Sequence, residues 1–161
     1  MDRVRIEAGD LDHAIAELAG AEDADMRRRA LAAALGSLTS IRNVLVQRDG
    51  PHYFMAAAAD RPRGAGAFEG LVFIGNAYRH DIARVVPLEP TMEGTFGSGP
   101  FGAGPFGVAW FAWRTLDESD FLHVPRDHRR SLPAYRDHVS GRPVGETLRE
   151  CRAFIAAAFG F

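Results

Sequence analysis

The fold class is decided by residues 67–86, AFEGLVFIGNAYRHDIARVV. Apolar side chains recur there at steps of three or four residues, at Leu71, Ile74, Tyr78, Ile82 and Val85. This spacing places them on one face of an α-helix. Pro87 follows directly, and proline lacks the N–H that would continue the helix. The stretch therefore predicts a long amphipathic helix that buries one face.

Two more helices are expected before this stretch. Asp10 is a suitable N-cap for a short helix that ends at Gly20. A longer helix is predicted from Glu22 to the stop formed by Asp49-Gly50-Pro51, with leucine and isoleucine at helical spacing. A short helix over 53–59 and a loop over 61–66 lead into the central stretch.

Two helices are expected near the C-terminus. Ser131 is the predicted cap of a helix that has Pro133 in its first turn and ends near Gly141. Pro143 opens the last helix, whose apolar stripe is Leu148, Cys151, Ile155 and Phe159. The sequence thus predicts an all-α fold, a bundle of four to five helices.

An unusual insertion interrupts the helices over residues 95–114. Phenylalanine recurs there every five residues, at Phe96, Phe101, Phe106 and Phe111. Five matches neither the helical nor the strand period, and the interleaved glycine and proline exclude a regular helix. The insertion is predicted to be an extended strip that plugs phenylalanines into a groove of the bundle, or a short β-hairpin with an arm over 108–114.

Composition bounds the class of protein. At 161 residues the chain is predicted to be one domain, 1–161. No apolar run reaches the ~20 residues that a membrane span needs, and the N-terminus lacks the apolar core of a signal peptide. The single cysteine excludes an internal disulfide, so a cytoplasmic protein without membrane contact is expected. The net charge of −2 supplies no overall attraction to nucleic acid.

Asn76 and His80 form the most suggestive polar pair. Four residues apart on a helix, their side chains lie about 40° from each other on one face. Imidazole suits proton transfer near neutral pH, and the amide beside it is placed to orient a substrate oxygen. The alternative is a histidine that packs or caps at a helix–helix seam.

The run from Gly70 to His80, GLVFIGNAYRH, resembles the core motif of HEPN domains (higher eukaryotes and prokaryotes nucleotide-binding). These are helical bundles, and many are metal-independent RNases of toxin–antitoxin, phage-defence and RNA-processing systems. Their motif is an arginine, usually followed by asparagine, and then a histidine on one long helix. Asn76 and His80 match it. The resemblance, which covers about 30–86 and 133–159, implies RNA as a partner, a homodimer, His80 as general base, and no cofactor or metal.

One position departs from the motif, because Gly75 stands where the family has its arginine. That arginine is assigned to the scissile phosphate, which a planar guanidinium binds well. Arg79, one turn later, is a candidate replacement because helical side chains lean toward the N-terminus. Arg42 and Asn43 on the preceding long helix are a second candidate pair for substrate binding. The departure favours a non-catalytic or weakened member over an active RNase.

The remaining side chains suggest weaker possibilities. Arg27 to Arg29, and Arg126 with Arg129 and Arg130, are basic clusters that solvated helix faces explain as well as RNA phosphates do. The three histidines at 123, 128 and 138 lack the cysteine pair of a zinc signature, so no metal site is predicted. Cys151 is expected in the core rather than as a nucleophile.

Two function classes without RNA chemistry stay open. A non-enzymatic interaction or regulatory module would use the phenylalanine strip to bind a partner protein. A small-molecule sensor would hold its ligand between bundle and strip, with Trp110 and Trp113 in the wall of the pocket.

Overall fold

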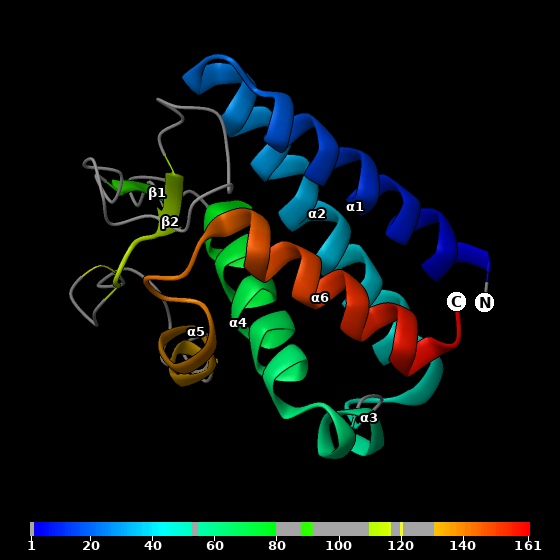
Figure 1. Ribbon diagram of the computed structural model, residues 1–161. Coiled ribbons are helices and arrows are strands. Elements are labelled where there is room, and N and C mark those ends of the chain that lie inside the picture. The colour runs from blue at the N-terminus through cyan, green and yellow to red at the C-terminus, as the bar shows by residue number, and fades with distance from the viewer. Residues whose placement is uncertain (1, 53–54, 80–87, 92–109, 117–119, 121–130) are drawn as a thin grey trace.

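The computed structural model describes residues 2–52, 55–79, 88–91, 110–116, 120 and 131–161 (Figure 1). The described chain is mostly helical, which confirms the predicted all-α class, and it adds one antiparallel pair of short strands. The elements in chain order are α1 (Asp2–Gly20), α2 (Ala24–Asp49), α3 (Met55–Asp60), α4 (Pro62–Arg79), β1 (Leu88–Thr91), β2 (Trp110–Trp113), α5 (Leu132–His138) and α6 (Val144–Phe159).

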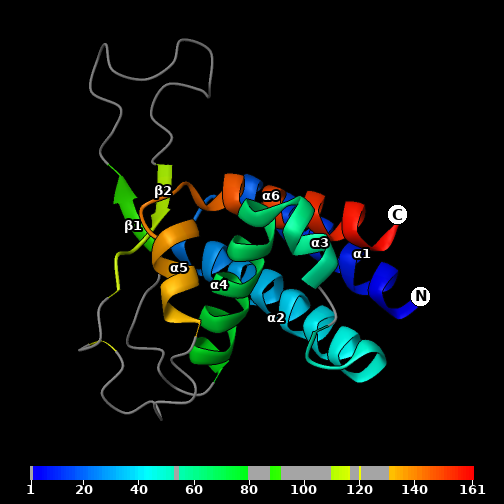
Figure 2. The same cartoon turned by 90° about the horizontal axis from the view of Figure 1, so that it is seen from below.

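Helix α4 lies at the centre of the bundle. It contacts α2, α5, α6 and the short α3, while α1 packs mainly along α2 and also touches α6 (Figures 1 and 2). Its residues are buried around most of the helix circumference, including Phe68, Leu71, Val72 and Ile74. The stretch that predicts the fold is therefore buried on several sides, not on a single stripe, because four other helices contact α4.

The start of the first helix differs from the prediction. Helix α1 begins at Asp2 and passes through Gly9 and Asp10 without a break, so Asp10 is not its N-cap. Burial of Val4 and Ala8 explains the longer helix, since both side chains add to the core only when the first two turns are helical. The predicted end at Gly20 is confirmed.

The limits of α2 follow its local signals closely. Asp23 is the N-cap, and its carboxylate accepts a hydrogen bond of 2.7 Å from the backbone N–H of Met26. At the other end Gly50 has a φ of 79°, a backbone conformation that glycine adopts without strain. These two signals lie within one residue of the sequence-based limits.

The predicted loop over 61–66 is wrong from residue 62 onward. Pro62 occupies the first position of α4, where its missing N–H costs no helical hydrogen bond. The glycines that favour a loop in isolation allow close helix contacts here. A Cβ on Gly64 would lie 2.7 Å from the Cβ of Phe154, and a Cβ on Gly70 would lie 2.8 Å from the Cα of Tyr135. Tertiary packing thus outweighs the low helix propensity of glycine.

The predicted insertion over 95–114 contains one of the two strands, β2, which confirms the expected arm over 108–114. Strand β2 pairs in antiparallel register with β1, with Leu88 opposite Trp113 and Thr91 opposite Trp110. Strand β1 precedes the predicted insertion, so the pairing starts earlier in the chain than expected. Most of the phenylalanine strip, including Phe96, lies outside the described residues. Phe111 is described, and it packs half-buried against the core, as predicted for a plugged phenylalanine.

The C-terminal helices match the prediction with one change. Pro133 lies in the first turn of α5, and Pro143 precedes α6 as its N-cap. Ser131 occupies the N-cap position of α5 but makes no capping hydrogen bond. Its hydroxyl donates instead to the Oε1 atom of Glu69 on α4, at 2.7 Å. A tertiary contact has replaced the local cap. Within the ranges described, no helix combines the length and apolarity that crossing a membrane requires.

Candidate functional site

Two of the three predicted catalytic residues, Asn76 and Arg79, belong to α4. Asn76 is partly exposed. The side chain of Arg79 and the whole of His80 lie outside the described residues. The pairing of Asn76 with His80 therefore stays a prediction.

The second candidate pair is on α2. Arg42 and Asn43 are both exposed there, one turn beyond Thr39. Among the described residues, no hydrogen bond or ion pair connects either side chain with Asn76. Arg42 and Asn43 are thus exposed on the neighbouring helix, and their part in a site with Arg79 and His80 stays a prediction.

Gly75 faces the interior, against α2. A Cβ built on this glycine would lie 3.0 Å from the carbonyl oxygen of Leu35, 3.0 Å from Oγ1 of Thr39 and 3.3 Å from Cβ of Leu35. The two oxygens are held in place, because the Thr39 hydroxyl donates a 2.9 Å hydrogen bond to the Leu35 carbonyl. Thr39 is buried, so neither oxygen has free space to move into. A side chain at this position would therefore require Leu35 or Thr39 to shift by a few tenths of an ångström.

The surroundings of Gly75 bear on the missing motif arginine. A side chain at this position points into the α2–α4 seam, where a phosphate could not reach it. The predicted replacement by Arg79 stays a prediction, because its side chain lies outside the described residues. The glycine is explained by helix packing without any reference to lost chemistry.

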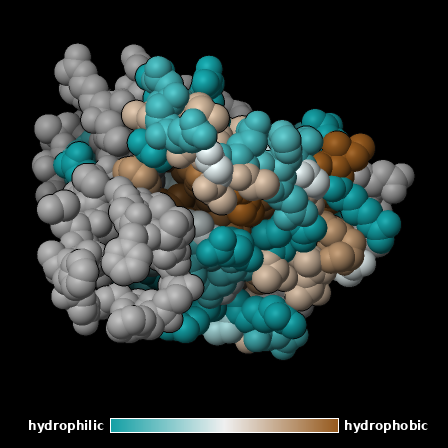
Figure 3. Space-filling view, turned by 45° about the horizontal axis from the view of Figure 1, so that its top comes forward, coloured by the Kyte–Doolittle hydropathy of each residue, from teal (hydrophilic) through white to brown (hydrophobic). Residues whose placement is uncertain are grey.

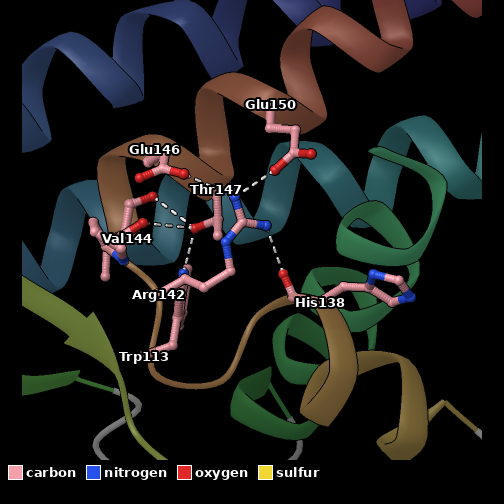
Figure 4. Close-up of polar contacts among 8 residues, drawn as sticks. Trp113, His138, Arg142, Val144, Glu146, Thr147 and Glu150 are labelled. Atoms are coloured by element: carbon pink, nitrogen blue, oxygen red, sulfur yellow. Dashed lines mark hydrogen bonds and ion pairs between the residues drawn. The ribbon is translucent and has the colours of Figure 1, made fainter. Parts of the chain in front are cut away.

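A polar cluster at the α5–α6 turn was not foreseen from the sequence (Figure 4). The Arg142 guanidinium donates to the carbonyl oxygen of His138 at 2.9 Å, to Glu146 at 2.9 Å and to Glu150 at 2.7 Å. Partial burial disfavours the charged guanidinium, but the hydrogen bonds to both glutamates outweigh burial and raise the pKa of Arg142. The signal available in the sequence was an arginine with glutamates four and eight residues later on one helix face.

The same turn anchors strand β2. The backbone N–H of Trp113 donates to the carbonyl of Arg142 at 3.0 Å, and the N–H of Gly141 donates to the carbonyl of Trp113 at 2.8 Å. The Trp113 indole N–H donates to Oγ1 of Thr147 at 2.5 Å, and that hydroxyl bonds to the carbonyl of Val144 (Figure 4). Trp113 is only 1% exposed. This cluster therefore joins β2, α5 and α6, and its tryptophan is a packing residue rather than the wall of an open pocket.

The remaining nucleophile and metal candidates are accounted for by the core. Cys151 is fully buried, and burial raises the pKa of its thiol far above the ordinary value. A neutral buried thiol is a poor nucleophile, as predicted. In the part of the chain that the structure describes, no three histidine, cysteine or acidic side chains gather as metal ligands. The ring of His138 lies against Gly66, while His123 and His128 lie outside the described residues.

The first basic cluster is largely engaged within the chain. The guanidinium of Arg27 lies 4.6 Å from the ring centroid of Phe111, and Arg28 pairs with Asp25 at 3.2 Å. Both contacts compete with phosphate binding, and the first holds the inserted segment against α2. The second basic cluster, over 126–130, lies outside the described residues.

Comparison with known proteins finds no protein-family model, no curated protein and no solved structure that matches the chain.

Proposed function

We propose that this protein is a non-catalytic HEPN-like helical module. In this proposal it acts by binding a partner protein and does not cleave RNA. The observation that carries the proposal is the place of Gly75 in the α2–α4 seam. A Cβ added to this glycine would lie 3.0 Å from the backbone carbonyl oxygen of Leu35. In the family resemblance, this position belongs to the arginine that holds the phosphate. Here it is committed to packing, so a substrate phosphate would have no partner at that position.

Three described groups that could in principle take part in catalysis are engaged in the fold instead. The buried thiol is protonated at neutral pH. Arg142 is held by two glutamates and a carbonyl, and Arg27 covers Phe111. Such engaged arginines stabilise the fold, and they are not placed to meet charge that develops during a reaction. In this proposal the helix that carries Asn76 is a scaffold that keeps the bundle geometry.

The test is cleavage of RNA without metal. Purified protein is incubated with a labelled single-stranded RNA and with a folded tRNA, in the presence of chelator. His80→Ala is the diagnostic variant, and His52→Ala is the matched control because His52 is an exposed histidine in the turn after α2. We expect wild type and both variants to leave the RNA intact. Cleavage by wild type and by the His52 variant that disappears in the His80 variant would overturn the proposal.

A second variant separates packing from lost chemistry. If Gly75 were only a lost phosphate ligand, Gly75→Arg would restore cleavage in a folded protein. A buried guanidinium without partners costs several kcal/mol, so we expect loss of cooperative thermal unfolding and no cleavage. A folded, RNA-cleaving Gly75→Arg protein would show that the seam is not closed and that the proposal is wrong.

The binding partner in this proposal is a second copy of the chain, as the family resemblance implies. Size-exclusion chromatography with light scattering measures this directly. We expect a mass near twice 17.6 kDa. A monomer mass at every protein concentration measured would refute the homodimer. A different partner protein would then be the alternative.

A further inference from the structure

We draw no further inference here: the strongest candidate, the surface patch at the start of α1 where the exposed Ile6 follows Arg5, whose guanidinium lies over the Phe161 ring, carries nothing because nothing in the structure shows what covers it (Figure 3 shows apolar side chains among polar ones on one face).

Discussion

The α2–α4 seam makes a sharp prediction about two glycines. Gly75→Ala adds a Cβ 3.0 Å from the Leu35 carbonyl oxygen, whereas Gly9→Ala on α1 adds one with nothing within 4 Å. Both substitutions lie in helices, so both gain about 1 kcal/mol of helix propensity. Only Gly75→Ala also crowds a backbone atom, because ordinary carbon–oxygen contacts need a few tenths of an ångström more.

The expected magnitude follows from that difference. Overpacking of a closed interior costs about 1–3 kcal/mol. The Gly9 variant should therefore be more stable than wild type by about 1 kcal/mol. The Gly75 variant should range from neutral to about 2 kcal/mol less stable, once its propensity gain offsets part of the overpacking. Because propensity cancels between the two variants, their difference measures the crowding alone.

Thermal unfolding followed by circular dichroism at 222 nm is the assay. For a chain of this size each 1 kcal/mol moves Tm by about 2–4 °C, so the two variants should differ by roughly 2–12 °C. Urea unfolding gives the same comparison at constant temperature. If Gly75→Ala stabilises the protein as much as Gly9→Ala does, the seam is open. The packing explanation of Gly75 would then fail, and with it the main support for the proposed function.

Three further predictions concern the core and the α5–α6 turn. Thr147→Val leaves the buried indole N–H of Trp113 without an acceptor and should cost about 1–3 kcal/mol by urea unfolding, and a loss below about 0.5 kcal/mol would contradict the hydrogen bond. Glu150→Gln should destabilise the protein more than Glu146→Gln does. The Glu150 side chain is 26% exposed and that of Glu146 is 59% exposed, so solvent screens the Arg142–Glu146 pair more strongly. The reverse order in thermal melts would be evidence against the described cluster. Burial raises the pKa of the Cys151 thiol in the folded protein above the ordinary value of 9.0. The contribution of the neutral thiol to the free energy of unfolding is therefore complete below pH 9.0. It is lost as the pH rises above that value, because the thiol of the unfolded chain ionises first. Wild type should then lose up to about 1.4 kcal/mol per pH unit more than Cys151→Ala does above that pH, and parallel pH profiles would argue against a buried thiol.

Helix identity was largely predictable because the signals are local. The Asp23 cap and the Gly50 stop act within one turn of the chain, and α2 obeys both. The stripe of α6 places Leu148 and Cys151 in the core as its spacing indicates. In these helices the deciding interactions join residues that are three or four positions apart. Both partners of each interaction are therefore visible in a short stretch of the sequence.

Where the prediction failed, contacts distant in the chain outweighed local preference. Glycines at 64 and 66 favour a loop in isolation, yet they are helical because α6 and α5 approach α4 closely there. Ser131 has the chemistry of a cap, yet its hydroxyl binds Glu69, 62 residues away. No window of the sequence contains both partners of such a contact.

The candidate site divides in the same way. From the sequence alone follows a long helix over 67–86 that carries Asn76 and a glycine in place of the motif arginine. What that glycine contacts is visible only once α2 is packed against α4. Helix periodicity indicates on which face of α4 position 75 lies. It does not indicate which helix packs against that face or how closely. The 2.9 Å hydrogen bond from Thr39 to Leu35 holds the oxygens that close the seam, and that bond belongs to another helix.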